Sequence, residues 1–177
     1  IVRVGKKSKS IHFDVRLDPA LPATHLVPDQ VEQVLINILI NAVDAVFDVQ
    51  QAERREGTIT VSSRVEGEYL QVTIDDNGKG MSEEQVEKIF EPFFTTKGPG
   101  RGLGLAAALG IVHGHRGSLQ VSSVPGKGST FRVFLPAAEA SFSTPAETAR
   151  GPAAETGALL LVVDDEDPLR RLLETAL

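Results

Sequence analysis

Two glycine-rich segments flank a stretch rich in phenylalanine, and an aspartate precedes the first of them. The first segment follows Asp76 and contains Gly78 and Gly80, and the second spans residues 98–105 with glycine at every other position. Glycine lets backbone N–H groups approach a ligand closely and reaches positive φ without strain. The second segment lies just before a predicted helix start, where unpaired N–H groups favour phosphate. The pattern favours a nucleotide as the ligand.

Asp76 ends a segment of alternating residues that is typical of a half-buried strand. Its parity places it on the same face as Leu70, Val72 and Ile74, which is predicted to be the buried face. A buried carboxylate needs a hydrogen-bond donor, and the exocyclic amine of adenine is one candidate. The alternative is an aspartate that only begins an Asp-Asn-Gly turn.

Four polar side chains follow one face of a helix predicted over residues 28–48. Asn37 and Asn41 are one turn apart in an otherwise apolar segment, and Asp44 and Asp48 continue the same face. Burying two carboxamides costs about 1–3 kcal/mol each unless they find partners. One interpretation is a pair of helix-to-loop hydrogen bonds within the core. The other is a polar ridge that suits Mg²⁺ and phosphate oxygens.

The segment between the two glycine clusters combines apolar and basic residues. Phe90, Phe93 and Phe94 surround a proline, which predicts either a hydrophobic anchor or a partner surface. The four glycines that follow predict a mobile lid, and Lys97 and Arg101 are placed to meet phosphates or simply to be solvated. The spacing does not match a P-loop, and a dinucleotide-binding fingerprint is disfavoured because no strand immediately precedes the glycines.

The remaining periodicity predicts an α+β fold, a two-layer sandwich with helices on one face of a mixed, mostly antiparallel sheet. A capping box at Ser82 and Gln85 predicts the start of a short helix. A hairpin is expected at residues 66–68. Strands are predicted at residues 11–17, 58–65, 69–76, 118–124 and 130–135, and helices at 28–48, 82–90 and 102–113.

Composition narrows the classes of function. The chain has 177 residues, 41% of them hydrophobic, a net charge of -6 and no cysteine. This excludes disulfides and thiolate metal sites, and it disfavours nucleic acid as a partner because no basic stripe is present. No uninterrupted apolar run approaches the roughly 20 residues of a membrane helix. The chain opens without a leader pattern and stops within an apparent helix, so we expect it to be part of a longer protein.

Taken together, these residues resemble the ATP-binding catalytic domain of sensor histidine kinases, in the group that includes DNA gyrase, the heat-shock chaperone of about ninety kilodaltons and MutL. Segments 37–42, 76–80, 90–94 and 100–105 look like the asparagine box, first glycine box, phenylalanine box and second glycine box, in the expected order. Residues 128–131 resemble the closing strand, whose threonine lies near adenine in relatives. The resemblance implies ATP and Mg²⁺ as cofactors, with Asn41 as a magnesium ligand and Asp76 bound to adenine. The nucleotide-binding residues expected in total are Asn37, Asn41, Asp44, Asp76, Gly78, Gly80, Met81, Phe90, Lys97, Gly100, Arg101, Gly102, Leu103, Gly104, Leu105 and Thr130.

The end of the chain resembles a second kind of domain. Residues 137–157 have the composition of a flexible linker. Residues 158–177 look like the truncated start of a response-regulator receiver domain, an incomplete βα unit with Asp164 and Asp165 as magnesium ligands. With the catalytic domain at residues 1–136, this organisation implies a hybrid histidine kinase.

The resemblance also implies what the chain does and lacks. None of the four histidines is followed by the acidic residue that the family places after its acceptor histidine. We therefore expect phosphoryl transfer to a histidine-bearing dimerisation domain of the same protein, then to a receiver domain or response regulator. Asn37 stands where hydrolysing relatives carry a glutamate base, and an amide cannot act as a general base.

Two other functions stay open on the sequence alone. One is an ATP-driven conformational clamp of the gyrase or MutL kind, and the other is a scaffold module that has lost its nucleotide. We expect the fragment to be cytoplasmic, with a parent protein that is compatible with a membrane anchor and is a homodimer at full length.

Overall fold

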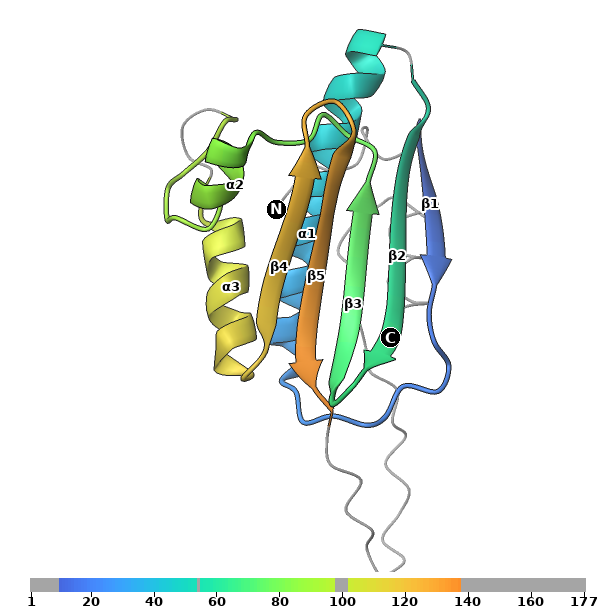
Figure 1. Ribbon diagram of the computed structural model, residues 1–177, viewed down its shortest axis with the longest axis vertical. Coiled ribbons are helices and arrows are strands. Elements are labelled where there is room, and N and C mark those ends of the chain that lie inside the picture. Colours follow the sequence, from blue (N-terminus) through green and yellow to red (C-terminus); the bar gives the residue numbers. More distant parts are fainter. Residues whose placement is uncertain (1–9, 54, 98–101, 138–177) are drawn as a thin grey trace, which may run out of the picture.

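The computed structural model describes residues 10–53, 55–97 and 102–137. One sheet and three helices make up this part of the chain (Figure 1). The linker predicted at 137–157, apart from its first residue, and the receiver-type segment at 158–177 lie outside the described residues, as do Gly100 and Arg101.

The sheet has five strands in the order β1-β2-β3-β5-β4. β1 (Ile11–Arg16) pairs in parallel with β2 (Gly57–Glu66), and all other neighbours are antiparallel. The other strands are β3 (Tyr69–Asp76), β4 (Ser118–Val124) and β5 (Gly128–Pro136). Gly67 adopts φ +61 in the β2–β3 hairpin, a conformation that glycine reaches without strain. The mixed sheet and the hairpin confirm the predicted fold class.

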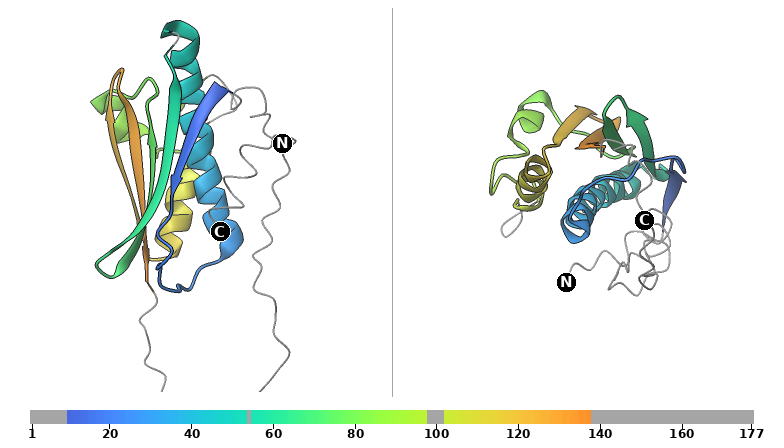
Figure 2. Two further views of the ribbon diagram at one scale, coloured as in Figure 1. Left: turned by 90° about the vertical axis from the view of Figure 1, so that its right-hand side faces the viewer. Right: turned by 90° about the horizontal axis from the view of Figure 1, so that it is seen from below.

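The helices are α1 (Pro28–Glu53), α2 (Glu83–Lys88) and α3 (Gly104–Gly114). α1 and α3 lie on one face of this sheet, and α2 lies beside the β4 edge (Figure 2). α1 begins with proline and carries Asp29 in its first turn, as expected. The predicted capping box caps the N-terminus of α2. The Ser82 hydroxyl accepts from the backbone N–H of Gln85, and the Gln85 side chain accepts from the backbone N–H of Ser82.

The core lies between α1, α3 and the inner face of the sheet. Ile38 and Val46 of α1 are buried against Ile59 of β2 and Ile74 of β3. By length and composition α1 could also cross a membrane, with a mean hydropathy of 1.3 over its most apolar window. Polar residues such as Asn37, Asn41 and Asp44 divide its apolar residues into short runs. The packing on the sheet makes it the core helix of this domain.

Several element boundaries differ from the prediction by one or two residues, and the end of α1 differs by five. α1 continues to Glu53 rather than ending near residue 48, because its last turn consists of good helix formers and Gln50 hydrogen-bonds to Ser10 beside β1. β5 begins at Gly128, two residues early, because Val124 and Gly128 close the β4–β5 ladder. Both changes lengthen their elements at the end of the sheet where Asp76 lies.

Candidate functional site

A cavity of about 910 Å³ opens between the middle of α1, the end of β3, α2 and the start of α3. Its volume lies within the range that small-molecule and cofactor sites occupy. Predicted residues that line it are Asn37, Asn41, Asp44, Asp76, Gly80, Met81, Lys97, Gly102, Leu103, Gly104 and Leu105. The fold thus brings together residues that are up to 68 positions apart in sequence, from Asn37 to Leu105.

Asp76 lies in this cavity with only 4% of its surface exposed. Its Oδ1 accepts a 2.8 Å hydrogen bond from the backbone N–H of Gly78. Burial raises the pKa of Asp76 to about 6, although the backbone N–H groups of Gly78 and Ser129 act in the opposite direction. The inward orientation confirms the parity argument. The site therefore offers a desolvated carboxylate to a hydrogen-bond donor of the ligand.

The loop that follows Asp76 is fixed to α1 and to the β4–β5 turn. Lys79 donates its backbone N–H to the carbonyl of Ala45 in α1, and its own carbonyl accepts from Gly126. A Cβ on Gly78 would lie 2.6 Å from the carbonyl carbon of Ala45, and one on Gly80, at φ +66, would lie 2.0 Å from the carbonyl oxygen of Val124. Both positions require glycine because backbone occupies the space of a side chain.

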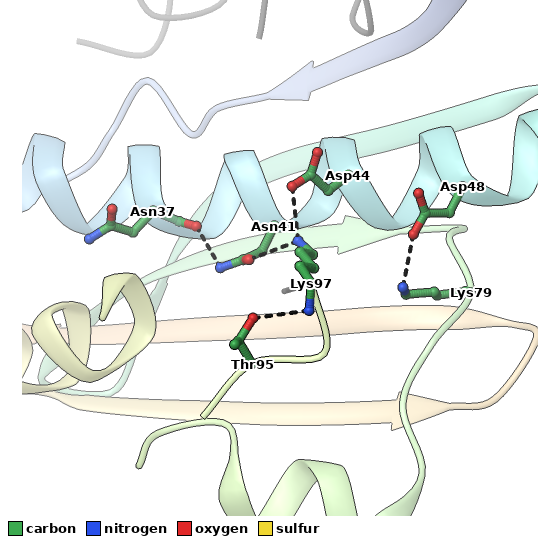
Figure 3. A network of polar contacts seen from close by, with 7 residues as sticks. All are labelled: Asn37, Asn41, Asp44, Asp48, Lys79, Thr95 and Lys97. Atoms are coloured by element: carbon green, nitrogen blue, oxygen red, sulfur yellow. Dashed lines mark hydrogen bonds and ion pairs between the residues drawn. The ribbon is translucent and has the colours of Figure 1, made fainter. Parts of the chain in front are cut away.

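The polar ridge predicted on α1 forms as expected (Figure 3). The Lys97 ammonium donates to Asn41 Oδ1 and to Asp44 Oδ2, at 3.1 Å each. One turn further, Asp48 pairs with Lys79 at 2.8 Å. Burial lowers the pKa of Lys97, and Asp44 opposes this effect. The oxygens of Asn41 and Asp44 thus hold a cationic group in this structure.

Asn37 has a different partner from the rest of the ridge. Its Nδ2 donates to the carbonyl of Gly104 at the start of α3, at 2.9 Å, and its Oδ1 accepts from Gln33. One interpretation of the sequence was a helix-to-loop hydrogen bond, and the acceptor is instead the first residue of α3. Since its amide both donates and accepts, Asn37 joins α1 to the N-terminus of α3 beside the cavity.

The start of α3 closes another side of the cavity. Gly102, at φ +113, accepts at its carbonyl a 3.0 Å bond from the backbone of Phe93. Phe93 is 75% exposed and also has positive φ, whereas Phe94 packs against the core and lines the cavity. The phenylalanine segment therefore serves both as an anchor, through Phe94, and as an exposed surface, through Phe93.

Among the described residues, three predicted site residues do not line the cavity: Thr130, Phe90 and Gly78. Thr130 lies on the opposite face of β5, where its hydroxyl donates to Asp75, and its expected place beside the ligand stays a prediction. Its neighbour Ser129 faces inward and pairs with Asp76 across the sheet. Phe90 packs against the core instead, and the cavity contacts come from Ile89 and Phe94. Strand parity with buried Phe131 would have identified Ser129 from the sequence.

Gly78 has an indirect place in the site, since it binds Asp76 without lining the cavity. Arg55, which sequence reasoning missed, lies behind it and donates to the carbonyls of Asn77, Gly78 and Gly126. No local pattern around Arg55 announces these contacts, because its partners are brought to it only by the sheet topology.

A family model described as "Histidine kinase-, DNA gyrase B-, and HSP90-like ATPase" matches residues 26–139. The sensor histidine kinase ZraS of Klebsiella oxytoca is 42% identical over 137 residues, which is 77% of this chain and 28% of that protein. The signal transduction histidine-protein kinase AtoS of Escherichia coli K12 is 37% identical over 77% of this chain and 21% of its own length. The chain thus spans about a quarter of the length of these curated relatives.

Solved structures agree with these matches. The catalytic domain of the histidine kinase ThkA, in a nucleotide-free form, is 31% identical with a TM-score of 0.61, and the match covers 72% of this chain and 80% of that one. The mycobacterial sensor histidine kinase MprB is 25% identical with a TM-score of 0.62, over 76% and 87% of the two chains. The chain therefore belongs to the histidine kinase-, DNA gyrase B- and HSP90-like ATPase family, and within it to the catalytic domains of sensor histidine kinases.

Proposed function

We propose that this chain binds ATP together with Mg²⁺ and donates the γ-phosphoryl group to a histidine on a separate segment of the same protein. The observation that carries the proposal is the buried carboxylate of Asp76 in a large cavity. A desolvated acceptor there would bind the exocyclic amine of adenine, because a buried carboxylate gains most from a ligand donor. The glycines at the start of α3 would lie beside the phosphates.

Asn41 and Asp44 of the ridge are proposed to hold Mg²⁺. Their Oδ1 and Oδ2 atoms converge on an ammonium group, which supports an arrangement that suits a cation. Among the described residues no group of three acidic, histidine or cysteine side chains forms a complete metal site. This suits Mg²⁺, which commonly takes one or two protein oxygens and completes its shell with substrate phosphates and water. Mg²⁺ would neutralise charge on the transferring phosphoryl group.

Lys97 and Arg101 are proposed as phosphate contacts. Lys97 lines the cavity and lies next to the oxygens assigned to Mg²⁺. If Mg²⁺ occupied those oxygens, the Lys97 ammonium would be released to contact the phosphates. Arg101 lies outside the described residues, and its role rests on its place in the glycine segment.

Asn37 favours transfer to a protein acceptor over hydrolysis. Its amide is held between Gly104 and Gln33, and an amide cannot take a proton from water. Phosphoryl transfer asks the protein mainly for positioning and charge neutralisation, which the cavity supplies without a nucleophile of its own. The acceptor histidine would come from a dimerisation segment, and the full-length protein would be a homodimer.

The wider organisation is also a proposal. Residues 158–177 would begin a receiver domain, in which Asp164 and Asp165 hold Mg²⁺, and residues 137–157 would link it to the catalytic domain. The phosphoryl group would pass to this receiver or to a separate response regulator. The catalytic domain would work in the cytoplasm, with a parent protein that is compatible with a membrane anchor.

Radiolabelled ATP distinguishes the candidate functions. With γ-labelled ATP and Mg²⁺, the full-length protein should become labelled through an acid-labile, alkali-stable bond, as expected of phosphohistidine. The 177-residue chain alone should bind ATP and release almost no labelled phosphate. A full-length protein carrying Asp76→Ala, which should be labelled less at ATP concentrations below saturation, serves as the control.

Two outcomes would contradict the proposal. Steady hydrolysis by the chain alone, with no labelled full-length protein, would favour an ATP-driven clamp. Absence of ATP binding by the correctly folded chain would favour a scaffold that has lost its nucleotide.

A further inference from the structure

Arg55 joins three segments at the end of the sheet where Asp76 lies. It follows α1 and precedes β2, and its guanidinium donates to the carbonyls of Asn77 and Gly78 and, at 3.3 Å, to Gly126 in the β4–β5 turn. The planar fork of arginine suits several acceptors at once, which a lysine ammonium does not match in geometry. Arg55 therefore fixes the loop after Asp76 from the side away from the cavity.

The bond to Asn77 has a particular consequence for Asp76. The carbonyl of Asn77 and the N–H of Gly78 belong to one peptide unit, which is planar and trans, so the two groups point in opposite directions. Arg55 holds the carbonyl end of this unit, and the N–H end donates to Asp76 Oδ1 at 2.8 Å. The orientation of the guanidinium is thus transmitted to the carboxylate through a single rigid group.

The same peptide also carries an electrostatic effect. A charged donor on the carbonyl polarises the peptide and strengthens its N–H as a donor, because hydrogen bonds in a chain reinforce one another. The side chain of Asn77 supports this unit separately, through bonds to the backbone N–H of Thr58 and the carbonyl of Glu56. The Asn77 side chain holds the loop to β2. Arg55 is the charged group that binds the Asn77–Gly78 peptide, and the N–H of this peptide contacts Asp76.

We propose that Arg55 is a positioning residue for recognition of the purine base, because it holds the Asn77–Gly78 peptide that orients the Asp76 carboxylate. The inference rests on the proposed binding of adenine by Asp76. It predicts that Arg55 affects the choice between bases with an amine and with an oxygen at position 6, although it lies outside the cavity lining.

The test measures the dissociation constants of ADP and inosine diphosphate by calorimetry on the 177-residue chain. These ligands share sugar and phosphates, and inosine replaces the 6-amine with an oxygen that the Asp76 carboxylate repels. Arg55→Met keeps the aliphatic stem and removes every donor. Arg64→Met is the matched control, because Arg64 binds Gln71 and Glu66 on the other face of the sheet. Asp76→Ala and the double variant complete a cycle.

The unmodified chain should prefer ADP by at least tenfold. Arg55→Met should reduce this preference about threefold to tenfold, as expected for a weakened charged hydrogen bond. Most of the change should come from weaker binding of ADP. Arg64→Met should keep the preference, and adding Arg55→Met to Asp76→Ala should change it no further. The ratio compares two ligands on the same folded molecules, so partial unfolding does not alter it. Arg55→Gln provides the same measurement if Arg55→Met does not fold.

Equal weakening of both ligands by Arg55→Met would overturn the inference, since it would make Arg55 a structural residue only. A further loss of preference in the double variant would also overturn it, because the effect would then bypass Asp76. If the unmodified chain binds ADP without preference, or fails to bind it, the proposed adenine site itself is wrong. That result is distinct from a failure at Arg55.

Discussion

Asp76 illustrates a conflict between stability and binding at the scale of one residue. Its carboxylate is almost fully buried and its pKa is raised to about 6, mainly by loss of hydration. A carboxyl group whose pKa is higher in the folded than in the unfolded protein destabilises the folded state whenever it is ionised. Binding sites often carry such a cost, because the same desolvation strengthens the hydrogen bond to the ligand.

Asp76→Asn should therefore stabilise the empty protein at pH 8. The folded-state pKa lies above the ordinary value of 3.8, so the folded protein holds the proton more tightly than the unfolded chain does. The free energy of unfolding of the unmodified protein then falls as the pH rises from about 4 to about 6 and stays lower above. We expect a gain of roughly 1–3 kcal/mol at pH 8 that shrinks as the pH falls below 6. Urea unfolding at several pH values measures it.

Asp75→Asn is the control for this prediction. Asp75 is exposed on the other face of the sheet and binds Thr130, so its substitution should change stability by less than about 0.5 kcal/mol at any of these pH values. A pH-independent effect of Asp76→Asn, or a loss of stability at pH 8, would show that burial of the charge is not what raises the pKa.

Asn41→Ala should weaken ATP binding mainly when Mg²⁺ is present. Its Oδ1 is one of the oxygens that hold the Lys97 ammonium, and we assign it to the metal in the loaded site. Calorimetry with Mg²⁺ and with EDTA measures the two affinities. Asp48→Ala is the matched control on the same helix, since Asp48 pairs with Lys79 and does not line the cavity. Equal effects of Asn41→Ala in both conditions would contradict a role as metal ligand.

At the scale of elements, two glycines separate structural necessity from simple tolerance. Gly80 has φ +66 and no room for a Cβ, because the carbonyl oxygen of Val124 would lie 2.0 Å away. Gly110 is exposed in the middle of α3, and a Cβ there would meet nothing within 4 Å. The loop after Asp76 requires glycine at position 80. At position 110 glycine only lowers the stability of the helix relative to alanine.

Gly80→Ala should lower the free energy of unfolding by at least about 2 kcal/mol, through positive φ and the backbone clash. Gly110→Ala should raise it by about 0.5–1 kcal/mol, because alanine favours the helix. Chemical denaturation of both variants gives the comparison. Similar changes at the two positions would mean that the loop after Asp76 relaxes freely, contrary to the tight packing described above.

Most elements could be predicted because their signals are local. The period of two in β3, the hairpin at Gly67 and the capping box at Ser82 depend on neighbouring residues, and the structure confirms each. The family likeness pointed to Thr130, whereas strand parity would have pointed to Ser129, which lines the cavity. The end of α1 was missed because a bond between Gln50 and Ser10 joins residues 40 positions apart.

At the scale of the whole molecule, the site exists only through the order of the strands. β5 lies between β3 and β4, which brings Ser129 beside Asp76 and the β4–β5 turn beside the glycine loop. The predicted fold class did not specify this order. The contacts of Arg55, which depend on it, therefore could not be found from the sequence. Asp76 and Asn41 could be found because strand and helix periodicity already placed them on inner faces, and Lys97 could be found from its position beside the second glycine segment.

The most direct test of the account is calorimetric titration of Mg–ATP into the 177-residue chain and into Asp76→Ala, with Asp75→Ala as control. The unmodified chain and the control should bind with the same affinity. Asp76→Ala should bind about tenfold to a hundredfold more weakly, which corresponds to the loss of one charged hydrogen bond of about 1.5–3 kcal/mol. An unchanged dissociation constant for Asp76→Ala, or no binding by the unmodified chain, would contradict it.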